Sequence, residues 1–263
     1  TDTFNTAVGF FAGLAVTTGT FNTLIGGLAG DAITDADFNV AVGTNALTTD
    51  TFGSKTTAIG HAALNTQNFG TATDTFNTAV GFAAGGAVTT GIKNVLIGAN
   101  AGQALTDADF NTAVGRESLG ADTLGSKSTA IGTNALAAQN FTTATDSNNT
   151  AVGFVAGQAI TTGTDNTIIG SIAGNALTVG TRNVVVGLDA LGADTKGSNS
   201  VAIGRSALAT QNFTTATQSH NTAVGDFAGA AVTTGTDNTL IGSATGDAIT
   251  DGNTNTAVGS FAL

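Results

Sequence analysis

The chain has 263 residues and a formal net charge of −11, from 7 basic and 18 acidic side chains. This balance argues against nucleic acid as a partner, because phosphate binding requires a positively charged surface. Cysteine is absent, which excludes disulfides and thiolate metal sites. The apolar stretches contain glycines and are too short to span a bilayer, so we expect no membrane insertion by these residues.

From the first residues onward, a Val-Gly or Ile-Gly dipeptide recurs fifteen times at a regular spacing. Its glycines are separated by three equal intervals and then a longer fourth one, and this order repeats. The first glycines are Gly9, Gly26, Gly43, Gly60 and Gly81. Four units therefore make one super-repeat, and the pattern starts again at Gly81, Gly153 and Gly225.

A fixed short period is typical of a solenoid, in which each unit forms one turn, or rung. We predict an all-β parallel β-solenoid of 15 rungs that forms one continuous domain over residues 1–263. Its super-repeats are expected at approximately 5–76, 77–148, 149–220 and, in part, 221–263.

Each rung begins with the pattern Asn-Thr-Ala-(Val/Ile)-Gly, which predicts a short strand, the first at residues 5–8. Strand side chains alternate between two faces, and β-branched residues favour strands. The fourth position is always Val or Ile, so we expect it to face the interior together with the second position. The third position would then face outward, yet it holds Ala ten times and is never polar.

An outward face that is apolar has to be covered. We therefore expect identical chains to meet through the third-position face, which predicts a homo-oligomer. The alternative is a flattened monomer in which both faces of this strand are internal.

The first position is Asn in twelve of the fifteen rungs. In-register stacking would align these side chains in a ladder that bonds rung to rung, as in other stacked β-structures. We expect the ladder to be structural. Its members are Asn5, Asn22, Asn39, Asn77, Asn94, Asn111, Asn149, Asn166, Asn183, Asn221, Asn238 and Asn255.

Every fourth rung has four extra residues, which predict a row of related loops on one side of the solenoid. Loops of this kind commonly carry recognition, and the amides beside Phe could contact a surface glycan or a matrix protein. The structural alternative, which we favour for Phe, is that Phe packs under the loop while the amides cap backbone groups. The candidate residues are Gln67, Asn68, Phe69, Gln139, Asn140, Phe141, Gln211, Asn212 and Phe213.

Two acidic turns, with Asp35 and Asp37 and then Asp107 and Asp109, could hold Ca²⁺ together with backbone oxygens. The corresponding later turns do not keep the carboxylate pair, so ordinary solvated turns are the favoured interpretation. His61 and His220 occupy non-equivalent positions without a repeated partner. We therefore expect no catalytic site, no cofactor and no metal centre.

The sequences Asn-Thr-Ala-Val-Gly at 221–225 and Ser-Val-Ala-Ile-Gly at 200–204 resemble the head repeats of YadA-like trimeric autotransporter adhesins. Similar repeats occur in phage tail fibres, and the resemblance covers essentially the whole chain. It implies a trimeric, left-handed parallel β-roll exposed on a bacterial cell surface or in a virion fibre.

Together these observations predict a non-enzymatic, extracellular fibre segment that displays periodic loops for attachment. A phage tail fibre shaft and a self-assembling extracellular filament are the close alternatives. An ice-binding solenoid is the weaker one. The Thr-Thr pairs such as Thr17-Thr18 recur in only one rung of four, and the more continuous Thr rank shares the face that we expect to be buried.

Overall fold

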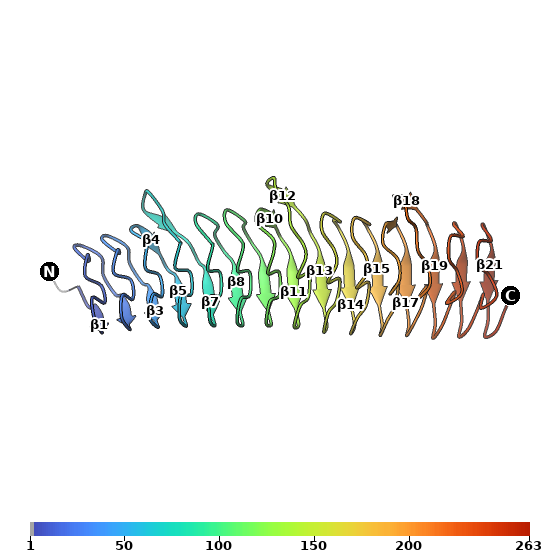
Figure 1. The fold of residues 1–263 in the computed structure, drawn as a ribbon, viewed down its shortest axis with the longest axis horizontal. Coiled ribbons are helices and arrows are strands. Elements are labelled where there is room, and N and C mark those ends of the chain that lie inside the picture. The colour runs from blue at the N-terminus through green and yellow to red at the C-terminus, as the bar shows by residue number, and fades with distance from the viewer. Residues whose placement is uncertain (1–2) are drawn as a thin grey trace. The chain divides into compact units, whose positions relative to one another are not determined.

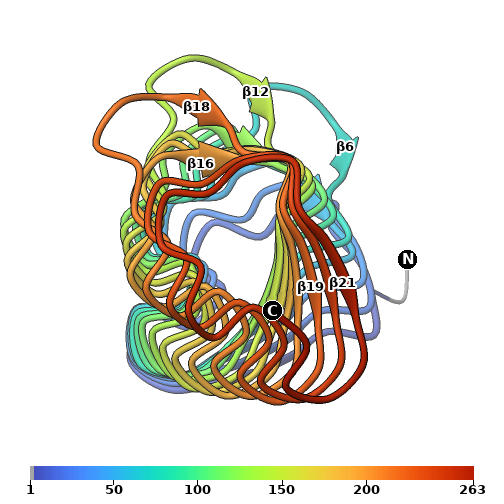
Figure 2. The same cartoon turned by 90° about the vertical axis from the view of Figure 1, so that its right-hand side faces the viewer.

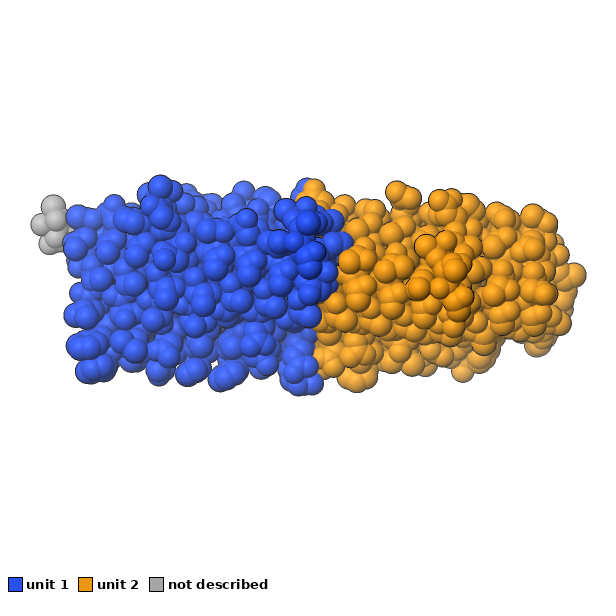
Figure 3. Space-filling view, turned by 45° about the horizontal axis from the view of Figure 1, so that its top comes forward, with its two compact units in different colours: residues 1–128, 140–145 blue, residues 129–139, 146–263 orange. Residues whose placement is uncertain are grey.

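The computed structural model describes residues 3–263, and all regular elements among them are β-strands. The predicted fold is confirmed: the chain is a parallel β-solenoid of about fifteen turns, each carrying one three-residue strand (Figure 1). The first two residues of the predicted domain lie outside the described part. Two compact units divide the solenoid, coloured in Figure 3: unit 1 comprises Thr1–Ser128 with Asn140–Thr145, and unit 2 comprises Thr129–Gln139 with Asp146–Leu263.

In unit 1 the strands run side by side in chain order and form a parallel sheet. They are β1 (Thr6–Val8), β2 (Thr23–Ile25), β3 (Val40–Val42), β5 (Thr57–Ile59), β7 (Thr78–Val80), β8 (Val95–Ile97) and β9 (Thr112–Val114).

Unit 2 repeats this arrangement, and in Figure 2 its strands β19 and β21 lie along the same side of the coil. Its strands are β11 (Thr129–Ile131), β13 (Thr150–Val152), β14 (Thr167–Ile169), β15 (Val184–Val186), β17 (Val201–Ile203), β19 (Thr222–Val224), β20 (Thr239–Ile241) and β21 (Thr256–Val258). Each residue pairs with its equivalent one turn later, as Ile168 does with Val185.

Short two-residue strands mark the long turns that the longer fourth interval predicts. They are β4 (Gly53–Ser54), β6 (Thr73–Asp74), β10 (Gly125–Ser126), β12 (Thr145–Asp146), β16 (Gly197–Ser198) and β18 (Thr217–Gln218). Within unit 1, β4 pairs in parallel with β6, and within unit 2, β16 pairs with β18.

The prediction of which strand face is buried was wrong. The third position is the one that points into the coil: Ile168 and Ala202 have 0% of their surface exposed. The β-branched fourth position points out, and Ile169 and Ile203 are 40% and 36% exposed. The physical reason is the narrowness of the coil, where opposite walls leave room for Ala more often than for a β-branched side chain.

Inside the coil, large and small side chains complement one another. Leu24 is fully buried, and its methyl groups occupy the space beside Gly13 and Gly30, where a Cβ would come within 2.7 Å of them. In the next turn, Leu47 stands at the position of Gly13 and Gly30, and the strand contributes the smaller Ala41 in place of Leu24. This complementarity explains why Gly, Gly, Leu and Leu follow one another through each super-repeat: the volume inside each turn is shared differently while the packing stays dense.

The glycine after each strand allows neighbouring turns to approach at the backbone level. At Gly170, for example, φ is +139°, and an added Cβ would lie 2.4 Å from the carbonyl oxygen of Gly187. Only glycine adopts this conformation without strain and leaves room for the next turn. The Val-Gly and Ile-Gly repeat is therefore a requirement of stacking.

Candidate functional site

One sheet face runs along each unit and is formed by the outward side chains at the second position, Thr or Val, and at the fourth position, Val or Ile. We call it the outer sheet face. The fourth position is Val or Ile throughout, and the second is Thr in eleven rungs and Val at 40, 95, 184 and 201. The side chains of Ile25, Ile97, Ile131 and Ile241 are 38–40% exposed. A regular, flat and apolar surface of this kind is typical of a face that contacts something other than bulk water.

The long loops keep their Gln and Phe inside, which removes these residues from the candidate recognition surface. Gln67, Gln139 and Gln211 are 0% exposed, and Phe69, Phe141 and Phe213 are 6–7% exposed. The favoured expectation that Phe packs beneath the loop agrees with these values. Of the nine candidates, only Asn68, Asn140 and Asn212 remain exposed.

A buried polar network explains why the loop Gln is internal. In unit 2, Gln211 donates from Nε2 to the carboxylate of Asp194 (2.6 Å) and to Ser200 Oγ (2.9 Å), while its Oε1 accepts from Asn221 Nδ2 (2.8 Å). Gln67 makes the corresponding bonds to Asp50 (2.5 Å), Thr56 and Asn77 in unit 1. The amide thus connects the Asn ladder across the rung in which Ser or Thr replaces Asn.

The carboxylate of Asp194 is fully buried, and no cation accompanies it among the bonds described. Four N–H groups compensate for its charge: Oδ1 accepts from the backbone of Gly197 (2.9 Å), Lys196 (3.2 Å) and Phe213 (3.2 Å), and Oδ2 accepts from Gln211. Hydrogen bonds to an ionised acceptor are the strong ones. Sequence reasoning missed these aspartates. The signal was present, because Asp-x-x-Gly replaces an aliphatic residue at the same place in each super-repeat, at Asp50, Asp122 and Asp194.

The Asn ladder bonds each turn to the next through side chain and backbone together. Asn183 Oδ1 accepts the N–H of Ser200 (2.9 Å), and its Nδ2 donates to the carbonyl of Gly197 (3.0 Å). The backbone N–H of Asn183 in turn donates to Asn166 Oδ1 (3.0 Å). Within the interior of the stack these amides are 0–1% exposed, so they hold the solenoid together and do not face a ligand.

The acidic turns use their carboxylates to cap the preceding turn. Asp37 Oδ1 accepts from the backbone and the hydroxyl of Thr20 (2.7 and 2.8 Å), and Asp109 Oδ1 accepts from the N–H of Ile92 (2.7 Å). Asp35 and Asp107 accept from threonine hydroxyls in the same way. Among residues 3–263, no three His, Cys, Asp or Glu side chains are grouped as a metal site requires.

The two histidines have separate surroundings. The ring of His61 stacks on Phe82, with 5.3 Å between the ring centroids, and His220 Nδ1 lies 3.4 Å from Asp237 Oδ1. Both side chains are exposed, and they lie in non-equivalent surroundings.

Two carboxyl groups have perturbed acidities. Burial raises the pKa of Asp31, whose Oδ1 has no hydrogen-bond partner. At the surface, hydrogen bonds from Arg205 lower the pKa of Asp226, with both guanidinium contacts at 2.9 Å. The neighbour of Asp226, Arg205, stays protonated and does not exchange a proton with it. Neither carboxyl group is therefore part of an acid–base pair.

No helix among the described residues is long and apolar enough to cross a membrane. Comparison of the chain with protein-family models, with curated proteins and with solved structures gives no match.

Proposed function

We propose that this chain is a non-enzymatic segment of a structural or adhesive fibre in which three copies pack through their outer sheet faces. The observation that carries the proposal is the outward rank of Val and Ile on one side of the turns, in which the Ile residues are exposed and most of the Val residues are half-buried. An apolar sheet face in contact with water is costly, and a second apolar sheet is the partner that covers it with complementary shape. The interface is thus assigned to the second and fourth positions, in place of the third.

Such a trimer would present the long loops, with Asn68, Asn140 and Asn212, away from the covered face. Each asparagine accepts a hydroxyl hydrogen bond at Oδ1, as Asn212 does from Thr195 (3.1 Å), and its amide nitrogen is directed to solvent. Repetition on several copies would give weak loop contacts avidity. An extracellular place, on a bacterial surface or in a tail fibre, belongs to this proposal, as does the related case of a self-assembling filament.

Light scattering in dilute solution tests the proposal. We expect a mass three times the 25.5 kDa of one chain. The double variant Ile169→Lys, Ile203→Lys places two charges on the outer sheet face and should reduce the mass to that of one chain. Thr162→Lys, at an exposed position off this face, is the matched control and should leave the trimer intact. A wild-type monomer would refute the proposal.

Ice binding is a second candidate, because the Thr rank at the second position faces outward. The sequence had suggested that this rank faces the interior. Thr and Val have nearly the same shape, so eleven Thr and four Val form a continuous rank beside the Val and Ile rank. The same face cannot be buried in a trimer and bind ice. A monomer that shows thermal hysteresis, lost in the Ile169→Lys, Ile203→Lys variant, would establish ice binding in place of assembly.

A further inference from the structure

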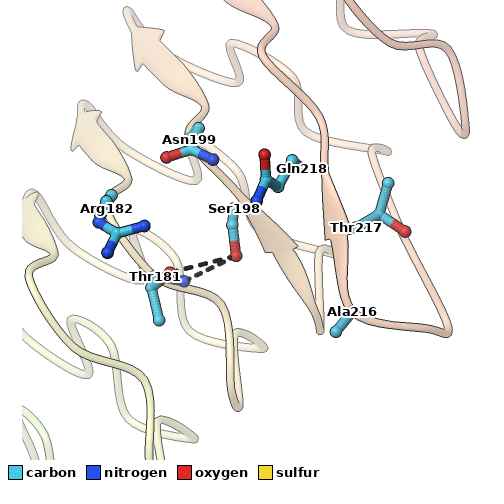
Figure 4. Close-up of a pocket in the computed structure, with 7 residues that line it drawn as sticks. All are labelled: Thr181, Arg182, Ser198, Asn199, Ala216, Thr217 and Gln218. Atoms are coloured by element: carbon cyan, nitrogen blue, oxygen red, sulfur yellow. Dashed lines mark hydrogen bonds between the residues drawn. The ribbon is translucent and has the colours of Figure 1, made fainter.

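A shallow groove lies in unit 2, where β18 and the loop before it stand beside β16 (Figure 4). Its volume is about 180 Å³, and its walls are Thr181, Arg182, Ser198, Asn199, Ala216, Thr217 and Gln218. The N–H of Thr181 donates to Ser198 Oγ (3.0 Å), which fixes the floor between two successive turns. All but one of the lining residues are polar.

Three of these polar side chains have no partner within the described protein. Arg182 makes no ion pair among residues 3–263, although Asp165 occupies the equivalent position one turn earlier. That carboxylate is engaged by Asn148 (3.2 Å) and Thr164 (3.0 Å). The side-chain amides of Asn199 and Gln218 also lack a hydrogen bond in the same part of the chain. Figure 4 shows these two amides on the same side of the floor as the guanidinium.

In the first super-repeat, the charged side chains at the equivalent positions pair with each other. There, Phe38, Lys55 and Asp74 stand where the third super-repeat has Arg182, Asn199 and Gln218.

Lys55 Nζ lies 2.5 Å from Asp74 Oδ2 and 5.2 Å from the centre of the Phe76 ring, so cation and anion neutralise each other. The second super-repeat carries the same residue types, as Phe110, Lys127 and Asp146. Only the third replaces the carboxylate with an amide and leaves a cation unpaired.

We propose that this groove binds the carboxylate of an acidic sugar, such as a uronic acid, with Arg182 as the anchor. A guanidinium presents two parallel N–H groups that match a carboxylate, and this bidentate pairing is strong and directional. Asn199 and Gln218 then supply donors and acceptors for sugar hydroxyls, and Thr217 and Ser198 add hydroxyl groups. An apolar side chain of a peptide would require an apolar pocket, and Ala216 alone does not make one.

The size and charge of the groove define the ligand further. Pockets for drug-sized ligands measure about 300 Å³ or more, so this smaller groove suits a ligand of the size of one sugar ring. A single unpaired cation, in a chain of net charge −11 with Asp165 one turn away, favours a monoanion over a doubly charged phosphate. Arg182 and Asn199 lie two residues before Val184 and Val201 of the outer sheet face, so sugar binding and assembly have to be measured separately.

Ligand-detected NMR on the full chain tests this assignment, with methyl β-D-glucuronide as the probe and methyl β-D-glucoside as its neutral match. We expect saturation transfer to the glucuronide alone. Arg182→Gln should weaken binding at least tenfold. Gln218→Asp should do the same while Arg182 is retained, because a carboxylate in the groove repels the carboxylate of the sugar and competes with it for the guanidinium.

Lys55→Gln, in the self-paired groove of unit 1, is the control and should not change binding. Equal transfer to both sugars, undiminished binding by Arg182→Gln, or no transfer to the glucuronide at all would each overturn the assignment. Circular dichroism and light scattering on the same samples show whether a variant folds and assembles as the wild type does. A loss of sugar binding is thereby distinguished from a failure of the proposed trimer.

Discussion

The buried carboxylate of Asp194 allows a sharp test of what stabilises the long turns. In Asp194→Asn the side chain keeps its shape, and Oδ1 can still accept from Gly197 and Phe213. The new amide nitrogen, however, faces the Nε2 donor of Gln211, which is 2.6 Å from Oδ2 in the wild type. Rotation of Gln211 does not help, because its nitrogen would then face the Nδ2 donor of Asn221, now 2.8 Å from Oε1.

The magnitude follows from the groups left without partners. A hydrogen bond to a charged group contributes about 1.5–3 kcal/mol, and a buried donor without an acceptor costs about 1–3 kcal/mol. We therefore expect Asp194→Asn to lower the free energy of unfolding by about 3–5 kcal/mol. For a cooperative transition in a chain of this size, that corresponds to a decrease in Tm of roughly 6–20 °C.

Thermal unfolding followed by circular dichroism measures this change, and hydrogen exchange over residues 194–213 shows whether the loss is local. Asp251→Asn, at an exposed turn, is the control and should stay within about 0.5 kcal/mol of the wild type. If Asp194→Asn were neutral or stabilising, removal of the buried charge would outweigh the lost hydrogen bonds. The conclusion that four N–H groups compensate for the carboxylate would then be wrong.

Three further substitutions test the stacking and the buried charge. Gly60→Ala places a Cβ 2.3 Å from the carbonyl oxygen of Gly81 and should lower the free energy of unfolding by more than about 4 kcal/mol. Gly70→Ala meets no atom within 4 Å and should leave the stability unchanged. Chemical denaturation compares the two variants. Asn183→Ala leaves a buried N–H and a buried carbonyl unpaired and should cost about 2–5 kcal/mol by the same assay, a loss that Asn183→Asp would reproduce only in part. Asp31→Asn should stabilise the protein at neutral pH. Because the folded pKa of Asp31 is raised, its ionised form opposes folding above that pKa, and the effect disappears as the pH falls below the unfolded value. Unfolding at pH 3 and pH 7 should show the gain at pH 7 only, and an equal gain at both values would contradict the assignment.

The repeat spacing was enough to predict the fold, because stacked turns require the same residue at the same place in every turn. The Gly column and the Asn ladder are examples: each glycine backbone approaches the next glycine of the column, and each Asn side chain bonds the residue at the same position one turn away. Strand facing could not be derived in the same way. Val and Ile at the fourth position favour a strand but do not say which side is inside, since that depends on the width of the coil.

The candidate site was predicted only in part, for a related reason. Gln211 and Asn212 are adjacent and chemically alike, yet one is fully buried and the other exposed. The difference comes from a partner one turn earlier, Asp194, whose burial is a property of the folded turn. Likewise, Arg182 becomes notable only when Gln218, from a turn that is distant in sequence, is placed beside it.

The pairing of Asp194 on one turn with Gln211 on the next also bears on how such a chain can change length. Loss of one, two or three turns would separate a buried carboxylate from its amide, or set a Leu where its neighbour needs Gly. Deletion or duplication of one whole super-repeat keeps these buried pairs in register. These buried contacts therefore stay intact only when the protein is shortened, extended or recombined in steps of four turns, although its sheet could, in principle, be cut anywhere.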